Sequence, residues 1–488
     1  MERLTAADSW FFYLETPTVH LHVTGVVLLD PSTAPGGLTF DDMVRHVAGR
    51  LQLLPAFRRR LIEVPFGIDH PEFIEDPDFR IEEHLHHRVV TDGGTGGQFE
   101  ELVGRICSEQ LDRSRPLWEM YYVEGLEHGR SALVTKLHHA LVDGITGVEI
   151  LGQLVDLTPE PRSPGPEEPP WVPELVPTHE EAMIDASIHR LRTPLRPVQA
   201  IWRTATSVAR MSLATARTRL TLGERPAGAF DAPRTPFNST LTARRSVAFG
   251  STSLPDVKET RRAFGVKVND LVLAAVTTGL RRRFERDGTV PDRPLTCSVP
   301  VSVHGRGGDT STNQVSTMFV HLPVHVADPV ARLDLVRRST AGAKAVQGAM
   351  GPEMIGDVVD LIPPPLFHLG ADLWSRAHLP DHLPPVHNLI VSNVAGSSDP
   401  LYLAGAEVVG LYPFGPLMEG AALNVTVMSH LDVLDVGLIA CPDLLPDLDR
   451  LLDDVLAGFE ELRDLGRARL AEEEDQERSP LRDVHPPG

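Results

Sequence analysis

The feature that most constrains the fold of this chain is a short loop with two adjacent histidines. Residues 136–144 read Lys-Leu-His-His-Ala-Leu-Val-Asp-Gly, with the pair at His138 and His139. The run Ser131 to Leu137 before the pair is rich in apolar and β-branched residues and predicts a strand. Residues 145–157 after it carry apolar side chains at three- and four-residue steps, as a helix does. The sequence therefore predicts a strand-to-helix loop.

The two histidines have different surroundings if the strand runs through them. Side chains alternate along a strand, so His138 shares a face with Lys136, and His139 lies on the opposite face with Leu137. Only one histidine can then face a given cavity. A neutral imidazole, with a pKa near ~6.5, accepts a proton from a hydroxyl at physiological pH. The alternative interpretation is that both rings are structural members of a core.

The residues after the pair complete a recognisable pattern. Asp143 can orient a ring or anchor the loop through a basic partner, and Gly144 permits close approach of backbone or ligand. The full pattern H-H-x-x-x-D-G resembles the active-site motif of coenzyme A-dependent acyltransferases, a superfamily that includes chloramphenicol acetyltransferases and peptide synthetase condensation domains. The resemblance implies that His139 is the general base, that His138 is structural and that Asp143 holds the loop.

Composition excludes several functional classes. With 488 residues the chain has material for about two to four domains. Its formal net charge of −21 argues against a nucleic-acid partner, because binding phosphodiesters requires a positive field. The three cysteines, Cys107, Cys297 and Cys441, are far apart, which fits a reducing compartment and excludes a cysteine zinc site. Neither a secretory signal nor a membrane-spanning apolar run is apparent, so we expect a cytoplasmic protein.

Two further motifs narrow the resemblance. Residues 111–119 read Leu-Asp-Arg-Ser-Arg-Pro-Leu-Trp-Glu, and residues 268–270 read Val-Asn-Asp. Together with the histidine motif they resemble the bacterial wax ester synthase/diacylglycerol acyltransferase family, as do residues 8–17, 57–61, 75–77 and 412–420. Pro116, Leu117 and Trp118 are interpreted as a stiff turn with a buried tryptophan that supports the site. Asn269 or Asp270 is expected to cap the first turn of a helix and to anchor it near the active centre.

A metal site is the weaker interpretation of residues 82–88, which read Glu-Glu-His-Leu-His-His-Arg. On a strand, Glu82, His84 and His86 would share one face and offer three ligands. Nothing in the sequence makes them converge, so a solvated polar face is the simpler account. We expect no metal.

Changes in composition divide the chain. Eight prolines between residues 158 and 177 mark an extended linker. It is followed by a helical, arginine-rich stretch that could meet anionic headgroups or coenzyme phosphates. We expect an N-terminal domain over 1–157, linker and helical connector over 158–235, a C-terminal domain over 236–470 and an acidic flexible tail over 471–488. The basic stripe consists of Arg190, Arg192, Arg196, Arg203, Arg210, Arg217 and Arg219.

Periodicity places the other elements. Helices are predicted over Phe40 to Leu54, Phe99 to Gln110, Leu254 to Phe264, from Val266 onward, over Leu333 to Met350 and over Leu444 to Leu465. Strands are predicted over His22 to Leu29, Asn238 to Phe249, Thr296 to Val303, Val315 to Val324, Asn388 to Asn393 and Ala421 to Met428, with a loop at 412–416. Glycine-rich residues 305–309 could approach a phosphate.

The resemblance implies an α/β fold of two chloramphenicol acetyltransferase-like domains around a central active-site tunnel. It implies an O-acyltransferase that moves a long-chain acyl group from acyl-CoA, its substrate, to diacylglycerol or a fatty alcohol at a membrane or lipid-droplet surface, with no permanently bound cofactor. The alternatives are a related enzyme with a smaller acceptor and a non-catalytic lipid-surface protein. A serine nucleophile is disfavoured because Gly396-Ser397-Ser398 lacks the G-x-S-x-G order. Asn269, Asn388 and backbone amides are candidate oxyanion donors.

Overall fold

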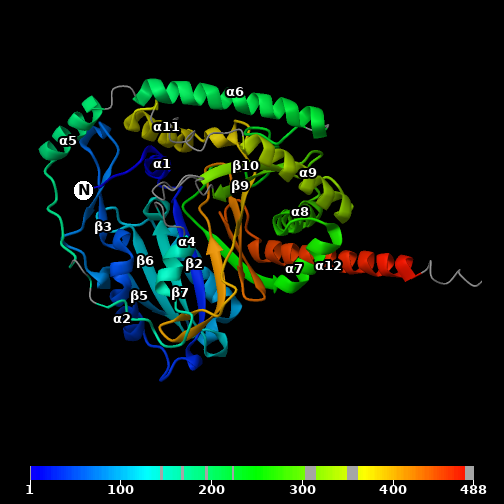
Figure 1. Cartoon of the computed structure of the whole chain (residues 1–488), viewed down its shortest axis with the longest axis horizontal. Coiled ribbons are helices and arrows are strands. Elements are labelled where there is room, and N and C mark those ends of the chain that lie inside the picture. Colours follow the sequence, from blue (N-terminus) through cyan, green and yellow to red (C-terminus); the bar gives the residue numbers. More distant parts are fainter. Residues whose placement is uncertain are drawn as a thin grey trace, which may run out of the picture.

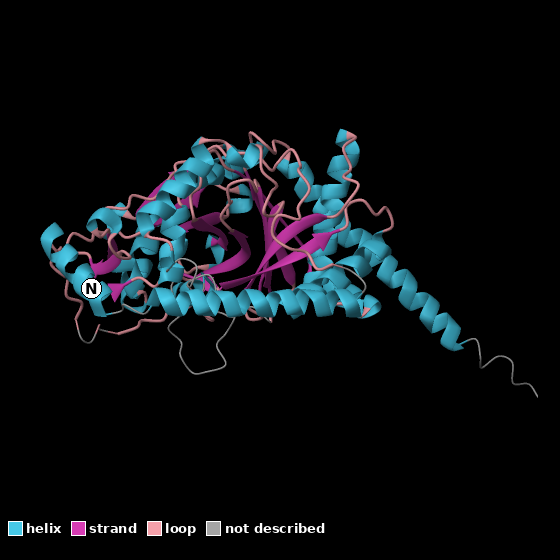
Figure 2. Ribbon diagram, turned by 90° about the horizontal axis from the view of Figure 1, so that it is seen from above, coloured by secondary structure: helices cyan, strands magenta, loops and turns pink. Residues whose placement is uncertain are grey.

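Two six-stranded β-sheets form the body of the protein, and helices lie against them (Figure 1, Figure 2). The described residues also form a small sheet of three strands. The structure is a computed structural model that describes residues 2–142, 147–165, 167, 170–192, 196–222, 225–302, 315–348 and 361–478. The mixed α/β architecture predicted from the sequence is confirmed.

Strands and helices alternate through most of the chain. The strands are β1 (Glu2–Arg3), β2 (His22–Asp30), β3 (Arg59–Ile62), β4 (Glu72–Glu75), β5 (Leu85–Val89), β6 (Trp118–Glu124), β7 (Ser131–His138), β8 (Ser246–Ser253), β9 (Leu295–Ser302), β10 (Val315–Leu322), β11 (Leu389–Val394), β12 (Tyr402–Leu403), β13 (Ala406–Phe414), β14 (Leu423–His430) and β15 (Val433–Ala440). The helices are α1 (Ala6–Leu14), α2 (Phe40–Arg50), α3 (Gln98–Ser108), α4 (Gly147–Leu154), α5 (His179–Arg192), α6 (Arg196–Leu222), α7 (Leu254–Phe264), α8 (Val268–Asp287), α9 (Pro329–Gln347), α11 (Pro364–Arg376) and α12 (Leu448–Arg478). A 3₁₀ turn, η8 (His139–Val142), follows β7 directly.

The central position of β7 in the first sheet fixes the histidines. The strand order of this sheet is β12-β13-β2-β7-β6-β5, and β7 pairs antiparallel with both β2 and β6. His22 lies opposite His138, and Trp118 lies opposite Leu137. Nearly every residue of β7 is buried, as expected for a strand covered on both faces.

The second sheet shares a core with the first half of the chain. Its strand order is β10-β9-β11-β14-β15-β8, and α8 and α12 pack together beside it. Ile106 of α3 and Leu273 of α8 belong to one buried cluster. A Cβ at Gly104 would lie 2.8 Å from the carbonyl oxygen of Arg245, so this glycine lets α3 approach the second sheet closely. The two halves therefore pack as one body.

A segment of the second half returns to the first sheet. β12 and β13 lie at one edge of that sheet, where Leu411 of β13 pairs with Val27 of β2. The predicted division at residues 236–470 therefore does not separate two independent sheets. The prediction of a loop at 412–416 is also wrong in part, because Tyr412–Phe414 are the last residues of β13. β12 is only two residues long, which leaves the distal part of β13 at the sheet edge, where Pro413 is tolerated.

Other boundaries differ from prediction where local chemistry decides them. The predicted strand from Asn238 begins only at Ser246, because the Asn238 side chain bonds to main-chain oxygens and holds residues 238–245 as a loop. The last helix was predicted to end at Leu465 but runs to Arg478 through a run of good helix formers. The first eight residues of the predicted tail, 471–478, are therefore helical; the remainder lies outside the described residues.

The connector runs along the outside of the body. The linker is held to the first half by Trp171, whose Nε1 donates to Glu75 at 2.7 Å. The long helix α6 then lies across the body and packs against α9 (Figure 1, Figure 2). In the described part of the chain no single helix has the length and apolar composition needed to cross a membrane; α7 and α8 pass that test only as a pair bent by 100°.

Candidate active site

The end of β7 directs the two histidines to opposite sides. The His138 N–H donates to the carbonyl oxygen of Leu117 at 2.9 Å, on the β6 side. The next N–H, of His139, donates to the carbonyl oxygen of Leu21 at 2.8 Å, on the β2 side. Because consecutive strand residues alternate in this way, the predicted separation of the two rings agrees with the backbone.

Helix α1 covers both histidine rings. Phe11 stacks on His139 with ring centroids 4.0 Å apart, and Phe12 stacks on His138 at 4.3 Å. Nearly parallel stacking of this kind fixes the planes of both imidazoles. The sequence showed an aromatic run at these positions but not that it packs on the histidines.

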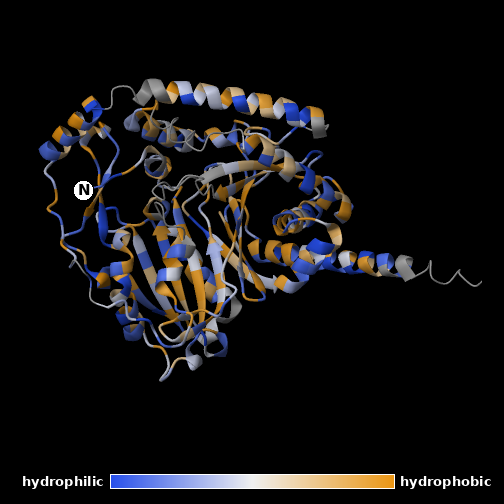
Figure 3. Cartoon of the chain, viewed as in Figure 1, coloured by the Kyte–Doolittle hydropathy of each residue, from blue (hydrophilic) through white to orange (hydrophobic). Residues whose placement is uncertain are grey.

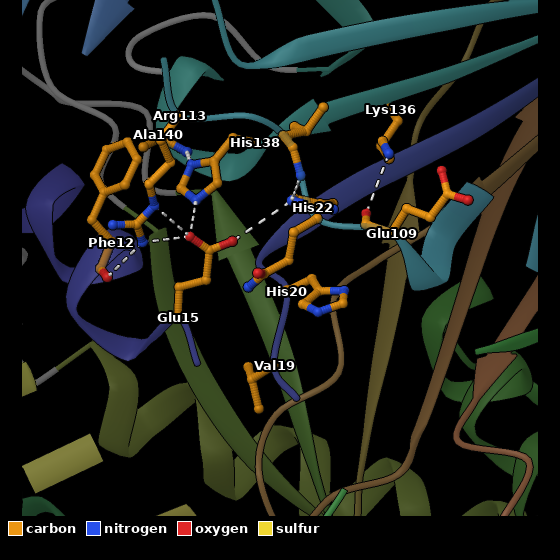
Figure 4. Close-up of polar contacts among 12 residues, drawn as sticks. Phe12, Glu15, Val19, His20, His22, Glu109, Arg113, Lys136, His138 and Ala140 are labelled. Atoms are coloured by element: carbon orange, nitrogen blue, oxygen red, sulfur yellow. Dashed lines mark hydrogen bonds and ion pairs between the residues drawn. The ribbon is translucent and has the colours of Figure 1, made fainter. Parts of the chain in front are cut away.

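His138 is fully buried, and one of its two ring nitrogens is held by a hydrogen bond. Its Nδ1 accepts the Ala140 N–H at 3.1 Å (Figure 4). Its Nε2 lies 3.7 Å from a carboxylate oxygen of Glu15, which is within ion-pair range but longer than a hydrogen bond. These contacts support the structural role that the sequence predicted for this ring.

Glu15, the C-terminal cap of α1, is the centre of a buried charge cluster (Figure 4). Its carboxylate contacts Arg113 at 2.5 Å and lies 3.6 Å from Nε2 of His22. Burial acts to raise the pKa of Glu15, but contacts with His138 and Arg113 outweigh it and lower the pKa to about 2. The carboxylate is therefore ionised at neutral pH.

His139 differs from its neighbour in having no such anchor. Its ring is half-buried, and its Nδ1 has no hydrogen-bond partner in the part of the chain that the structure describes. Burial is the main cause that lowers the pKa of His139 to about 4, while its own main chain acts in the opposite direction. At neutral pH the ring is unprotonated and able to accept a proton.

The Pro116–Leu117–Trp118 stretch supports the histidine turn, residues 138–142, from the β6 side. Trp118 is fully buried, and its Nε1 donates to the carbonyl oxygen of Phe57 at 2.8 Å. Its ring stacks on Phe57 and on His84, both with centroids 4.6 Å away. Leu117 supplies the carbonyl that receives the His138 amide. The predicted buried tryptophan is confirmed.

Lys136, on the same strand face as His138, is also completely buried. Its Nζ lies 2.8 Å from the Glu119 carboxylate and donates to the carbonyl oxygen of Ile106. It also donates to the carbonyl oxygen of Glu109 (Figure 4). A buried ammonium held by an anion and two carbonyls is a structural tie between β7, β6 and α3.

The Asn-Asp pair lies at the start of α8. The Asp270 carboxylate accepts the Lys267 N–H at 3.0 Å, so the predicted capping is confirmed for this residue. Asn269 is half-buried in the same turn. Among the contacts of the described residues, none joins this pair to the histidine turn.

Asn388 has no free donor for an oxyanion. Its amide donates to the carbonyl oxygen of Pro233 and to the side chain of Asn238, and its Oδ1 accepts the Thr296 N–H. All three contacts are between 2.6 and 2.8 Å. We therefore assign Asn388 to the structure of the second half, and the oxyanion donor remains among backbone amides and Asn269.

The three residues considered as metal ligands do not share a strand face. Glu82 lies in a 3₁₀ turn and His84 precedes β5, so the predicted strand began too early. His84 donates to the carbonyl oxygen of Trp118, and His86 lies against the ring of Tyr121. Within the described ranges, no group of three or more suitable side chains could hold a metal ion.

Two predicted features lie outside the described residues. These are Asp143 with Gly144, and the glycine-rich residues 305–309. Their expected roles stay predictions.

A cavity of about 480 Å³ lies at the far end of α4, the helix that follows the histidine turn. Its walls come from both halves of the chain, with α4 on one side and β13 and β14 on the other. The apolar lining residues are Leu151, Val155, Leu157, Leu401, Leu411 and Met428, and the polar ones are Asp156, Thr158, Glu160, Arg162 and Ser397.

Comparisons with known proteins agree with this geometry. The model of the wax ester synthase/diacylglycerol acyltransferase catalytic domain matches residues 4–272, and the model of the C-terminal domain of the same family matches residues 311–463. A Mycobacterium tuberculosis protein named as a diacylglycerol O-acyltransferase is 35% identical over 465 residues, which cover 95% of this chain and 90% of that protein.

Solved structures show the same fold. The wax ester synthase/diacylglycerol acyltransferase from Marinobacter aquaeolei VT8 is 28% identical, with a TM-score of 0.66 over 96% of this chain and all of that one. The first condensation domain of the calcium-dependent antibiotic synthetase shares the fold at 15% identity, with a TM-score of 0.53 over 95% of this chain and 96% of that chain. The chain is therefore an acyltransferase that belongs to the wax ester synthase/diacylglycerol acyltransferase family.

Proposed function

We propose that the protein transfers a long-chain acyl group directly from acyl-CoA to a hydroxyl, with His139 as the general base. His139 removes the proton of the alcohol while the alcohol oxygen attacks the thioester carbonyl. The carbon–sulfur bond then breaks, and the same proton passes from His139 to the departing thiolate. No acyl-enzyme and no bound cofactor take part. The observation that carries this proposal is the unprotonated, half-buried ring of His139.

His138 is a poorer candidate for the base. Its Nδ1 is occupied by the Ala140 amide, and its Nε2 faces the buried Glu15. A base must have a free nitrogen within reach of the substrate proton. Of the two rings, only that of His139 combines partial exposure with freedom from such contacts.

Diacylglycerol and long-chain alcohols are the proposed acceptors. The support comes from the names of the relatives: the mycobacterial protein is named for diacylglycerol, and the Marinobacter enzyme for both wax esters and diacylglycerol. The second candidate is a related reaction with a smaller acceptor, which the shared fold of condensation domains keeps open. The third is a lipid-surface protein without catalysis.

The cavity beside α4 is the proposed site of the acyl chain. Ligand cavities for apolar molecules are lined mainly by apolar side chains. Most of the surface that lines this cavity is apolar, although Asp156, Glu160 and Arg162 also border it. α4 leads to it from the histidine turn, so a chain that lies along the helix would place its thioester end towards His139.

Met428, almost fully buried in the cavity wall, offers a test. Met428→Trp should shorten the cavity and shift the preferred donor from palmitoyl-CoA towards shorter acyl-CoA. Turnover of acyl-CoA of graded length measures the shift. An unchanged length profile in a folded variant would place the acyl chain elsewhere.

We also propose that the protein works in the cytoplasm, attached reversibly to a membrane or lipid-droplet surface. The cysteines are buried and unpaired, as in a reducing compartment. Both proposed acceptors reside in lipid. Helix α6 supports the attachment because it exposes large apolar side chains beside arginines: Ile201, Trp202, Val208, Leu213 and Leu220 lie outward.

The basic stripe predicted from the sequence must be corrected at one residue, Arg190. Arg190 pairs with the buried carboxylate of Asp69 at 3.2 Å and donates to the carbonyl oxygen of Ile68. It therefore docks α5 onto the first half and is removed from the proposed lipid contact. Arg203, Arg210 and Arg217 are exposed and recur at seven-residue steps along one side of α6.

One assay separates the three candidate functions. Purified protein is given palmitoyl-CoA with diacylglycerol, hexadecanol or a short alcohol, and the free thiol and the ester product are both measured. The proposal predicts thiol release together with triacylglycerol or wax ester. Release only with the short alcohol would favour the second candidate, and no release with any acceptor would leave a lipid-surface protein.

A further inference from the structure

In the reaction proposed above, the buried carboxylate of Glu15 has no role. It lies behind the histidine turn, with its side chain only 4% exposed, and contacts two histidines and Arg113. Burying a carboxylate is costly unless it is paired, and Arg113 supplies that pairing. The pairing accounts for the charge of Glu15 but not for its placement against the histidines.

The placement is explained by the protonation of His138. Its Nδ1 accepts a hydrogen bond from the Ala140 N–H, so this nitrogen cannot itself carry a proton. The proton of the neutral ring must then lie on Nε2, the nitrogen that faces Glu15. An anion in that direction favours this tautomer over the other.

The tautomer in turn holds the backbone that carries His139. The Ala140 amide is the first N–H after His139, and its bond to His138 closes a loop of the chain around His139. If the proton of His138 moved to Nδ1, two N–H groups would face each other and the turn would have to open.

We propose that Glu15 is the positioning residue of this turn: its carboxylate keeps the proton of His138 on Nε2, so that Nδ1 holds the Ala140 amide and fixes the place of His139. Glu15 acts through His138 and does not touch the substrate. The inference rests on the proposed function, because it assumes that His139 is the base.

Arg113 provides a matched control. Its guanidinium contacts Glu15 on one side and Glu63, at 3.0 Å, on the other. The Glu63 side chain is 68% exposed, and no contact of the described residues joins it to the histidines. Glu15 and Glu63 therefore share one cationic partner but differ in their relation to the turn.

The test compares Glu15→Leu, Glu15→Gln and Glu63→Leu. Glu15→Leu removes the acceptor and should lower kcat about 10–100-fold, as is usual for loss of a supporting partner, with KM for palmitoyl-CoA unchanged. Glu15→Gln keeps an acceptor oxygen and should retain more of kcat. Glu63→Leu should match the parent. Equal losses in Glu15→Leu and Glu63→Leu would assign the effect to Arg113 and overturn the proposal.

A second measurement needs no variant. Nitrogen NMR of the histidine-labelled parent should show His138 with a proton on Nε2 and none on Nδ1, assigned by comparison with His138→Asn. A proton on Nδ1 in the folded parent overturns the proposal even if Glu15→Leu fails to fold. Failure of the proposed function is distinguishable, because a parent protein that releases no thiol would still report the tautomer.

Discussion

Large side chains lie inward at the histidine turn, whereas on helix α6 they lie outward. At the turn, Phe11 and Phe12 lie inward and stack on the imidazoles. On α6, three small residues, Ala200, Ser207 and Thr218, are buried. The outer face carries Trp202, which is 73% exposed, and other large apolar residues. Hydrophobic and hydrophilic residues are mixed along the whole of α6 (Figure 3).

This contrast agrees with the two proposed roles, proton transfer at the histidine turn and lipid contact at α6. A proton transfer needs rings whose planes and tautomers are fixed, and close packing with buried hydrogen bonds fixes them. A helix that packs through small side chains and exposes large apolar ones gains little from folding alone, so its pattern fits contact with lipid. The two regions should therefore respond to different substitutions.

The largest effect is expected from His139→Ala. Loss of the base should lower the rate of thiol release by about 10²–10⁴-fold, because this range is typical of general-base assistance. Binding to liposomes should not change, since His139 and α6 serve different requirements. Turnover close to the parent value, in a variant with an unchanged melting temperature, would refute the mechanism.

A smaller effect is expected from Asp143→Ala. The spacing of the motif predicts that this carboxylate anchors the loop rather than reacts, so stability should fall together with activity. Loss of charge-assisted hydrogen bonds costs on the order of 1.5–3 kcal/mol. Thermal denaturation and thiol release measure the two quantities. Lost activity at an unchanged melting temperature would instead give Asp143 a direct electrostatic role.

Much of the fold could be predicted because its signals are local. The limits of α7 were predicted correctly, since Ser253 caps its first turn and Gly265 ends it with a left-handed backbone. The return of β13 to the first sheet could not be predicted, because it depends on pairing between residues such as Leu411 and Val27 that are far apart in the chain. The local sequence around Leu411 or Val27 does not indicate which residue is its partner.

In the candidate site, too, contacts between residues far apart in the chain could not be predicted. The histidine pair and Trp118 stand out as motifs, whereas Glu15 and Arg113 are 98 residues apart and meet only through packing of α1 against the turn η8. The family-like stretches at 8–17 and 111–119 contain both residues but give no sign that they pair. For α6, periodicity predicts an amphipathic helix but not which face points inward, because that depends on its packing against α9, which is far away in the chain.

The next prediction concerns the outer face of α6. Three substitutions, Trp202→Ser, Leu213→Ser and Leu220→Ser, combined in one variant, should weaken flotation with liposomes at every salt concentration, because burial of apolar area does not depend on ionic strength. Leu175→Ser is the control, since Leu175 is 93% exposed but lies in the linker.

The smallest effect is expected from the arginines beside that face. Each basic side chain near an anionic surface contributes about 1 kcal/mol, and salt screens it within about 10 Å at 0.1 M ionic strength. Arg203, Arg210 and Arg217 changed together to glutamate should therefore reduce flotation with anionic liposomes at low salt and approach the parent at high salt. With neutral liposomes the charge variant should match the parent, whereas the apolar variant should still fail. If both variants float like the parent, α6 is not the lipid contact, and its exposed apolar face belongs to another partner, such as a second protein. Acyl transfer from palmitoyl-CoA to hexadecanol in detergent micelles should then keep its rate in both variants, because the proposed chemistry at the histidine turn does not depend on where α6 binds.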